Sequence, residues 1–490
     1  MFVVMVSSEF APAAQAGGLG EVVLGLSREL ALRGNAVDVI LPKYDCMRYD
    51  RIHDLTVAYE NLQVPWYSGA ISTTVWTGMV HGQRCFFIEP HSQDNFFKRQ
   101  QLYGYPDDVA RFAFFSKASL EFMLKTNRRP DIIHCHDWQT ALVPVLLYEI
   151  YNHIGMYNQR VCYTIHNFGH QGVTGESVLW ATGLTQTEHF YNYDRLRDNH
   201  NHFAINLMKG GIVYSNYVTT VSPQHAHEVQ HTEQGFGLEE TLSRYQNKFR
   251  GILNGIDYAV WNPEIDPLIA ERFSAARIEG KYGNKWALRE RLMLRQVYRP
   301  LLAYVGRLDR QKGVHLIRHA LPYALRHGAQ FVLLGTSPEP AIQDEFLRLK
   351  AEYNDNPDCH LEIGFSPELA HLIYAGADLV VVPSMWEPCG LAQLIALKYG
   401  TVPVVRHVGG LVDTVHDRQY SDRPWEQRNG FVFHQADEQA MESALARAFG
   451  LWSDFPGEFR RLMYQGMVQD HSWAMPGEAY LQVYEHIRHR

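Results

Sequence analysis

The stretch Asp378–Val404, DLVVVPSMWEPCGLAQLIALKYGTVPV, decides the fold of the second half of the chain. Leu379–Val382 is a short apolar run rich in β-branched residues, which favours a buried strand. Pro383 ends this run, and the residues after Glu387 place their apolar side chains on one broad face of a helix. Glu387 therefore lies between the carboxyl end of a strand and the amino end of a helix, where open α/β sheets bind ligands. From this stretch alone, a solvated or helix-capping carboxylate is the alternative.

The same alternation continues on both sides of this stretch. The segments LLAYVGRL, QFVLLGT and HLEIGF are predicted strands, and each is followed by a helical segment of about ten or more residues. VPVVR follows the Glu387 helix as another strand. Strands that alternate this regularly with helices predict a parallel, doubly wound sheet.

The first half opens with a similar unit. Phe2–Val6 is a predicted strand, Ala11–Gly20 a glycine-rich turn, Glu21–Gly34 a helix and Val37–Leu41 the next strand, which together form one right-handed βαβ unit. The turn would let the backbone approach a phosphate, although a packing role is the alternative. It is neither the G-x-G-x-x-G of dinucleotide binders nor a P-loop.

Further elements extend this first half. Short strands joined by turns are expected from Val57 to Pro90 as a sheet extension. A helix at Asp108–Lys125 and strands at Asp131–His136, Arg160–His166 and Tyr217–Val221 follow. The chain thus holds two nucleotide-fold halves, and a cleft between them is the expected ligand site.

Length and composition set the class of protein. A chain of 490 residues is too long for one core, so two or three domains are expected. The apolar content of 46% and charged content of 20% are typical of a soluble globular protein. The net charge of −8 without a basic stripe argues against non-specific nucleic-acid binding. Six scattered cysteines without a C-x-x-C pair, and a start that is typical of a strand rather than a signal peptide, favour the cytoplasm.

The segment Gly306–Gly313, GRLDRQKG, supplies positive charge. It follows a predicted strand and precedes a helix, so Arg307 and Lys312 should lie at the same edge of the sheet as Glu387. Two cations there can hold a diphosphate, since each charge-assisted contact contributes about 1.5–3 kcal/mol. A solvated surface pair is the alternative.

Three histidines stand at or near strand ends. His134 and His136 share one face of their strand, and His166 ends the next strand. No third ligand stands at a regular spacing, so a metal site is the weaker interpretation. We expect these histidines to hydrogen-bond a polar ligand.

Taken together, these segments resemble the bacterial glycogen synthases and plant starch synthases, which are retaining glucosyltransferases of the GT-B fold. The resemblance covers nearly the whole chain, in one order: SSEFAP with GGLGEV, HCHDWQTALVP, YTIHN, VTTVSP, GFGL, GILNGID, VGRLDRQKG, PSMWEPCGLAQLIALKYGTVPVVR and VGGLVDTV. The wider GT-B set has a second Glu eight positions after the first, and this chain has Ile395 there, as is usual for the synthases.

The resemblance implies an α/β GT-B fold with two Rossmann-like, doubly wound domains facing across a cleft. Residues 1–257 would form the N-terminal domain on the acceptor side. Residues 258–472 would form the C-terminal domain on the nucleotide-sugar side. Residues 473–490 would form a helix that crosses back to the N-terminal domain.

The implied reaction transfers glucose from ADP-glucose, with UDP-glucose as the alternative donor, to the non-reducing end of an α-1,4-glucan with retention at C1. The implied partners are the glucan and the nucleotide sugar, with no nucleic acid, membrane, metal or other cofactor. Without an obvious second carboxylate, retention suggests same-face attack assisted by the departing phosphate.

The resemblance also implies roles for individual residues. Arg307 and Lys312 would hold the donor diphosphate and offset charge on the leaving group, while Glu387 would position the glucosyl unit and stabilise an oxocarbenium-like transition state. The implied catalytic set is Glu387, His166, Asp137, Arg307 and Lys312, with Asp137 near the acceptor. The implied donor-binding set is Gln15, Gly17, Gly18, Asn167, Asn254, Arg307, Lys312, Glu387, Cys389, Gly390, Leu391, Gly409 and Gly410.

Three positions depart from the family pattern. Gln15 replaces the lysine of Lys-x-Gly-Gly-x-x-Asp, Glu21 replaces its aspartate, and Ala392 replaces a usual threonine. Loss of the lysine charge would remove about 1.5–3 kcal/mol of interaction with an anionic donor. The alternative function is therefore a weakened or inactive homologue that binds glucan or nucleotide sugar, or primes a partner. A GT-B transferase with another sugar donor is a further alternative, and a dinucleotide oxidoreductase lacks its glycine motif.

Overall fold

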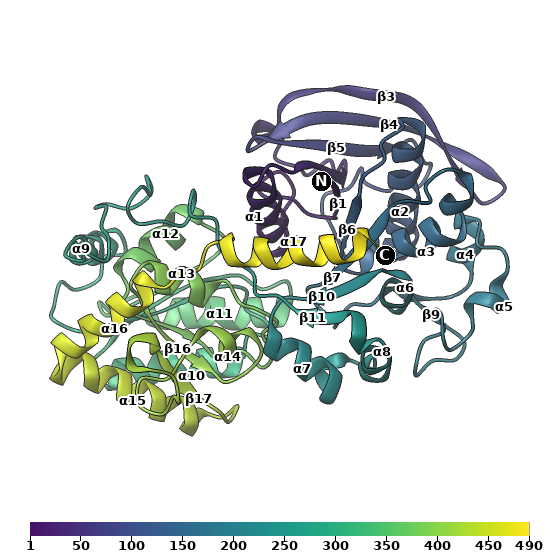
Figure 1. Cartoon of the computed structure of the whole chain (residues 1–490). Coiled ribbons are helices and arrows are strands. Elements are labelled where there is room, and N and C mark those ends of the chain that lie inside the picture. The colour runs from purple at the N-terminus through teal and green to yellow at the C-terminus, as the bar shows by residue number, and fades with distance from the viewer. Residues whose placement is uncertain (490) are drawn as a thin grey trace. The chain divides into compact units, whose positions relative to one another are not determined.

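The computed structural model describes residues 1–489 (Figure 1). The chain forms two compact units. Unit 1 comprises residues 1–254 together with the segment from Trp473 onward, and unit 2 comprises Gly255–Ser472. Each unit contains its own parallel sheet.

Unit 1 is built on a nine-stranded sheet with the order β11-β10-β7-β6-β1-β2-β5-β4-β3. The strands from β11 to β5 run parallel, and the extension predicted between Val57 and Pro90 is confirmed as β3 and β4, which pair antiparallel beside β5. The bounds are β1 (Phe2–Val6), β2 (Ala36–Pro42), β3 (His53–Trp66), β4 (Gly69–Val80), β5 (Gln83–Pro90), β6 (Ile132–His136), β7 (Arg160–Ile165), β10 (Tyr217–Thr220) and β11 (Phe249–Gly251).

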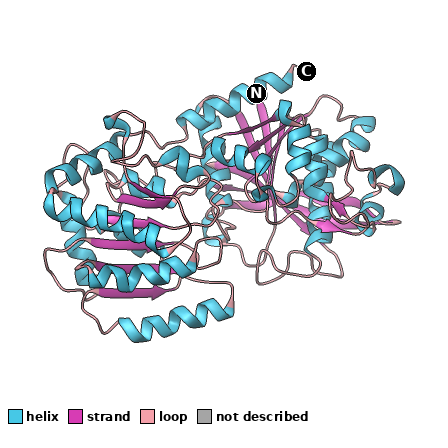
Figure 2. Cartoon of the chain, turned by 90° about the horizontal axis from the view of Figure 1, so that it is seen from below, coloured by secondary structure: helices cyan, strands magenta, loops and turns pink. Residues whose placement is uncertain are grey.

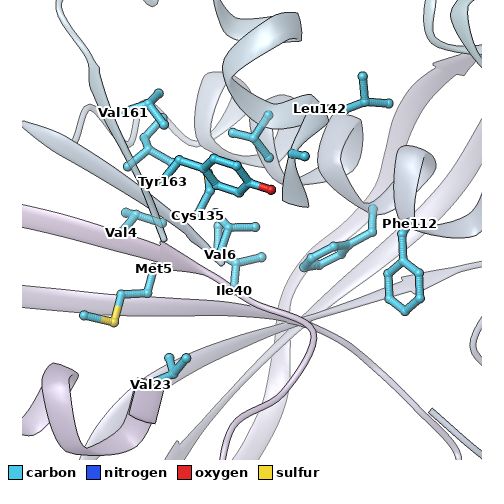
Figure 3. Close-up of a cluster of buried hydrophobic side chains, with 14 of the residues drawn as sticks. Val4, Met5, Val6, Val23, Ile40, Phe112, Cys135, Leu142, Val161 and Tyr163 are labelled. Atoms are coloured by element: carbon cyan, nitrogen blue, oxygen red, sulfur yellow. The ribbon is translucent and has the colours of Figure 1, made fainter. Parts of the chain in front are cut away.

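Helices cover both faces of this sheet. On one face lie α1 (Leu19–Leu32) and α17 (Ala474–Arg488), which contact each other, and on the other lie α2 (Asp108–Lys125) and α3 (Leu142–Glu149). Figure 3 shows Met5 of β1 near Val23 of α1, while Val6 and Tyr163 point to the opposite side of the strands. The buried core therefore follows the alternation of side chains along the central strands.

Smaller elements complete unit 1. The two-stranded sheet pairs β8 (Val173–Thr174) with β9 (Ile205–Asn206), and the remaining helices are α4 (Ser177–Thr182), α5 (Thr187–Phe190), α6 (Leu207–Tyr214), α7 (Pro223–His231) and α8 (Glu239–Arg244). α7 begins directly after Ser222, whose side chain accepts a hydrogen bond from the His225 backbone N–H at 3.0 Å and so caps the helix.

Unit 2 is built on a six-stranded parallel sheet with the order β14-β13-β12-β15-β16-β17. Strands are drawn in magenta and helices in cyan in Figure 2. The predicted doubly wound arrangement is confirmed, and the strand order reverses between β12 and β15, which is the switch point where such sheets bind ligands. The bounds are β12 (Leu301–Val305), β13 (Gln330–Gly335), β14 (Cys359–Ile363), β15 (Leu379–Val382), β16 (Val402–Arg406) and β17 (Phe431–Phe433).

The helices of unit 2 also cover two faces. α9 and α12 pack together with one set of buried side chains, and α10, α13, α15 and α16 pack around the other. The bounds are α9 (Gly280–Arg291), α10 (Val314–Arg326), α11 (Pro340–Tyr353), α12 (Pro367–Gly376), α13 (Ala392–Lys398), α14 (Gly410–Thr414), α15 (Glu438–Asp454) and α16 (Pro456–Val468). Within residues 1–489, no helix combines the length and apolar character needed to cross a membrane.

Candidate active site

The loops after β12 and β15 form one site at the switch point of unit 2. Because β12 and β15 are neighbours in the sheet, the segments that carry Arg307 and Glu387 leave it side by side. The Met385 backbone N–H donates to the Gln311 carbonyl at 2.7 Å. Gly313, at φ +73, lies against the Pro383 carbonyl so closely that a Cβ would not fit. These contacts hold the two loops together.

Glu387 lies at the centre of this site and is only 4% exposed. Its Oε2 accepts hydrogen bonds from Lys312 Nζ at 2.5 Å and Ser384 Oγ at 2.8 Å. A buried carboxylate needs such partners, because desolvating an unpaired charge is costly. The structure thus brings Lys312 and Glu387 together at one edge, as the sequence predicted.

Arg307 lies at the same edge but remains open to solvent. Its side chain is 48% exposed, and its Nη1 lies 3.3 Å from Asp309 Oδ2. Its Nη2 donates to Gln311 Oε1 at 3.4 Å. The guanidinium therefore has donors available for an anionic ligand.

The glycines expected to approach a ligand also have a packing role. Gly409 has φ +51, and a Cβ there would overlap the Glu387 carbonyl. The Gly410 backbone N–H donates to that carbonyl at 2.9 Å, and a Cβ on Gly410 would overlap Cys389. Both glycines therefore fix the backbone that carries Glu387.

The turn from Cys389 to Leu391 leads into α13. Cys389 is buried, Gly390 has φ +77, and Leu391 precedes the first helical residue. Gln393 Nε2 donates to the carbonyls of Cys389 and Gly390 at 2.9 and 2.8 Å. Sequence reasoning missed this role of Gln393, although a buried glutamine in the first turn of a helix needs such partners.

Asp137 ties together the ends of two strands in unit 1. It follows β6 with φ +58, and its Oδ1 accepts backbone N–H bonds from His166 at 2.7 Å and Asn167 at 3.2 Å. Desolvation raises the pKa of Asp137 to about 7, against the opposing effect of these two bonds. Its Oδ2 has no hydrogen-bond partner within residues 1–489 and can accept one from a ligand.

The histidines require a correction. His134 and His136 are both fully buried and do not face a ligand, because this side of β6 is covered by α17. Their partners are internal: His134 contacts Thr164 and Tyr484, and His136 contacts His166. Only His166 is partly exposed. Among residues 1–489, no group of three or more His, Cys, Asp or Glu side chains is placed to hold a metal ion.

Glu9 is a functional candidate that sequence reasoning missed. It is 4% exposed, and its Oε2 accepts backbone N–H bonds from Ala16 at 2.8 Å and Gly17 at 3.1 Å. Its Oε1 accepts from Tyr103 OH at 2.8 Å. The carboxylate therefore shapes the glycine-rich turn, and its position shortly after β1 was the available indication.

The glycine-rich turn itself leaves space above its backbone. A Cβ on Gly17 would meet no atom within 4 Å, which is compatible with a ligand approaching there. Gly18 precedes α1 with φ −76, a value open to any residue. Gln15 Nε2 donates to the Gly17 carbonyl at 3.1 Å and to Glu21 Oε1 at 3.2 Å, so two of the departures from the family pattern are paired.

The two predicted asparagines differ in their surroundings. Asn167 Oδ1 accepts the Gly169 backbone N–H at 2.9 Å, which shapes the loop after β7. Asn254 is 7% exposed, and its buried Oδ1 has no partner within the described residues. Their contacts with a sugar remain predictions.

Two pockets complete the picture. In unit 1, a pocket of about 500 Å³ is lined by Tyr105, Trp138, Gln171 and Phe236 among others. In unit 2, a pocket of about 820 Å³ lies at the ends of β16 and β17 and contains none of the predicted site residues. The first pocket adjoins Asp137 in the chain and combines aromatic with polar side chains, a composition that suits a sugar.

Comparisons with known proteins agree with this architecture. A family model described as "Starch synthase catalytic domain" matches residues 2–244, and one described as "Glycosyl transferases group 1" matches residues 294–454. The chain is 62% identical over 491 residues to Glycogen synthase 1 of Synechococcus sp. (strain JA-3-3Ab), with 100% of both chains covered. It is 60% identical to Glycogen synthase 2 of Methylococcus capsulatus, with 99% of both covered.

Solved structures give the same result. The catalytic domain of Starch Synthase IV from Arabidopsis thaliana, bound to ADP and acarbose, is 43% identical, with a TM-score of 0.97 and coverage of 100% of this chain and 99% of that one. Sucrose-phosphate synthase from Thermosynechococcus elongatus is 20% identical with a TM-score of 0.62, over 99% of this chain and 98% of that one, and shares the fold.

These likenesses define the class as a GT-B glycosyltransferase, as the sequence predicted. Within that class, identity over the full length decides the family. The chain belongs to the family of bacterial glycogen synthases and starch synthases and is a retaining glucosyltransferase. Its partners are a glucan acceptor and a nucleotide-sugar donor.

Proposed function

We propose that the chain transfers glucose from ADP-glucose to the non-reducing end of an α-1,4-glucan with retention at C1. The observation that carries this proposal is the Lys312–Glu387 pair beside the exposed Arg307 at the switch point of unit 2. A nucleotide-sugar donor brings a diphosphate and a glucosyl group to one place, and these side chains match the two parts. The ADP in the Arabidopsis Starch Synthase IV structure supports ADP over UDP.

In this mechanism, cationic side chains act on the leaving group. Arg307 and Lys312 bind the diphosphate and stabilise the charge that develops as the bond to C1 breaks. No metal or other cofactor is required for this step in the proposal. Glu387, held by Lys312 and Ser384, positions the glucosyl unit and stabilises positive charge near C1.

The same proposal accounts for retention without a second carboxylate. The position eight residues after Glu387 is Ile395, which is 4% exposed and packs in the core. It offers no nucleophile. The acceptor hydroxyl therefore attacks from the face that the diphosphate leaves, and the departing phosphate takes the hydroxyl proton.

Unit 1 supplies hydrogen bonds to sugar. Asp137 Oδ2 and the open nitrogen of His166 can bind hydroxyl groups, and Trp138 and Tyr105 in the adjacent pocket can pack against glucosyl rings, which present apolar faces. This arrangement suits a neutral glucan rather than a charged acceptor.

The test is incorporation of radiolabelled glucose into a glycogen primer from ADP-glucose and, separately, from UDP-glucose. We expect turnover with ADP-glucose to exceed that with UDP-glucose, and the added units to be released by an exo-acting α-1,4-glucosidase. Equal or faster turnover with UDP-glucose would overturn the donor assignment. Added units that resist the glucosidase would overturn the linkage.

A further inference from the structure

Three histidine rings form a stack in unit 1 whose middle member has no assigned role. The ring centroids of His134 and His136 are 4.2 Å apart, and those of His136 and His166 are 5.4 Å apart. The stack runs from the helix α17 side of the sheet to the partly exposed His166. His136 Nδ1 lies 3.1 Å from His166 Nε2, so one hydrogen bond joins these two rings.

All three rings are neutral at physiological pH. Desolvation lowers the pKa of His134 and of His166 to about 3 and lowers that of His136 well below its ordinary value. A neutral imidazole carries one N–H donor and one acceptor nitrogen. The contact between His136 and His166 therefore has two possible directions, which leave different nitrogens open on His166.

The inner end of the stack shows how burial selects a direction. His134 Nδ1 lies 2.7 Å from Tyr484 OH, and His134 Nε2 lies 2.6 Å from Thr164 Oγ1. Within residues 1–489, the buried Tyr484 hydroxyl has no hydrogen-bond partner other than His134. Its O–H is therefore satisfied only if Tyr484 donates to His134 Nδ1. His134 then carries its proton on Nε2 and donates to Thr164.

The same reasoning applies to His136. Its Nε2 is buried and has no hydrogen-bond partner within residues 1–489. A buried N–H without an acceptor is costlier than a buried lone pair without a donor, because orphaned donors are the rarer of the two in folded proteins. The proton of His136 therefore lies on Nδ1, from which it is donated to His166 Nε2.

We propose that His136 is a positioning residue that fixes His166 as the Nδ1–H tautomer, so that His166 presents a hydrogen-bond donor to the bound sugar. The contact to the sugar rests on the proposed function. The tautomer does not, since it follows from the His136–His166 contact together with the buried, unpartnered Nε2 of His136. Asp137 supports the arrangement by holding the His166 backbone N–H at 2.7 Å.

The direct test is the protonation of the His166 ring in the full-length protein labelled with nitrogen-15 histidine. Long-range proton–nitrogen correlation spectra, with the His166 signals assigned by comparison with His166→Gln, should show a protonated Nδ1 and an unprotonated Nε2. The opposite pattern would overturn the proposal, whether or not the protein transfers glucose.

A matched pair of variants tests the kinetic consequence. In His136→Asn the amide nitrogen can occupy the place of Nδ1 and donate to His166, whereas in His136→Gln the amide lies near the place of Nε2. We expect His136→Gln to lower kcat about 10–100-fold, as loss of an outer-shell partner does elsewhere, with little change in KM for glucan, and His136→Asn to recover most of that loss. Equal losses in the two variants would contradict a positioning role.

Tyr484→Phe separates positioning from general packing. It removes the donor to His134 but leaves the His136–His166 contact in place. We expect a lower Tm with the His166 tautomer unchanged. A switch of the His166 proton to Nε2 in Tyr484→Phe would show that the whole stack, rather than His136, sets the tautomer.

Discussion

The strand-end residues of unit 2 are charged, whereas the environment of those in unit 1 favours their neutral forms. In unit 2, Lys312 and Glu387 form an ion pair at 2.5 Å next to the exposed Arg307. In unit 1, desolvation moves the pKa of His166 down to about 3 and that of Asp137 up to about 7, so each shift favours a neutral side chain. The first arrangement suits a diphosphate, and the second suits the hydroxyl groups of a glucan. In the proposed function, unit 2 therefore binds the diphosphate of the donor, and His166 and Asp137 of unit 1 bind sugar hydroxyl groups.

The largest effect is expected from removing the cation of the unit 2 pair. Lys312→Met keeps the length of the side chain but leaves Glu387 buried without its charged partner, and it removes a stabiliser of the leaving group. We expect kcat to fall about 100–1,000-fold, measured by glucose incorporation from ADP-glucose.

The control for this variant is Lys350→Met. Lys350 also pairs with a glutamate in unit 2, at 3.4 Å from Glu362, but both side chains are more than a third exposed. We expect near wild-type turnover from it, because exposed pairs contribute little. If Lys312→Met lowers kcat no more than Lys350→Met does, the ion pair in unit 2 has no part in the reaction, and the contrast in charge between the two units loses its functional meaning.

The next effect concerns the raised pKa of Asp137. The folded protein binds the proton of the Asp137 carboxyl more tightly than the unfolded chain, in which the pKa of this group has its ordinary value of 3.8. Raising the pH from about 4 to about 7 therefore costs the folded state stability. Asp137→Asn removes this cost, so its Tm relative to wild type should rise across that window. We also expect kcat to fall about 10–100-fold, because the proposed hydrogen bond from a sugar hydroxyl to the carboxylate contributes about 1.5–3 kcal/mol.

The Tm of wild type and of Asp137→Asn, measured at pH values from 4 to 8, tests this effect. The raised pKa of Asp137 sets this pH range. A difference in Tm between the two proteins that does not change with pH would mean that the pKa of Asp137 is not raised. The strand-end residues of unit 1 would then include a charged carboxylate, as those of unit 2 do. Asp131 offers a control at the opposite end of β6, where its side chain is 32% exposed and lies 3.3 Å from Arg488 Nε.

A smaller effect tests whether charge can be added to unit 1. Gln15 is exposed and donates a hydrogen bond to Glu21. The family usually has a lysine at the position of Gln15. Gln15→Lys should raise kcat/KM for ADP-glucose about tenfold, since a charge-assisted contact contributes about 1.5–3 kcal/mol. Gln15→Met, which is uncharged, should not raise it. An equal response to both substitutions would show that charge at this position has no part in donor binding.

The smallest effect concerns the one carboxylate that organises the glycine-rich turn. Tyr103→Phe removes the hydrogen bond to Glu9 Oε1 and keeps the ring. We expect KM for ADP-glucose to rise only a few-fold, because Glu9 Oε2 keeps its hydrogen bonds to the backbone N–H groups of Ala16 and Gly17. Tyr49→Phe, which removes a bond to the Tyr44 carbonyl, serves as the control. A change of similar size in both would assign the effect to general stability.

The sequence predicted the unit 2 site better than the unit 1 site, for a physical reason. Arg307, Lys312 and Glu387 stand directly after parallel strands, and the carboxyl ends of such strands share one edge of the sheet. Sequence order alone therefore brings them together. The helices α9, α15 and α16 were not predicted, but none of the predicted site residues lies in them.

In unit 1, the decisive facts are burial and pairing between distant elements. His134 and His136 lie on the face covered by α17, which follows some 340 residues later in the chain, and nothing in their local pattern shows this. Glu9 was overlooked because two of its partners are backbone N–H groups, which nearly every residue carries, and the third, Tyr103, lies 94 residues away in the chain. The roles of Asn167, Asn254 and the glycines at 17 and 18 stay predictions, as do the roles of the unit 2 residues.

The position of α17 has a consequence for how the protein is made. Trp473 contacts α1 at Gly25, and Tyr480 and Tyr484 lie in the core of unit 1, although all of unit 2 is translated before them. A nascent chain that has just completed unit 2 still lacks the helix that buries the inner histidines. The apolar face of unit 1 that α17 covers therefore stays uncovered until the segment from Trp473 onward has been translated, so unit 1 begins before unit 2 but is completed after it.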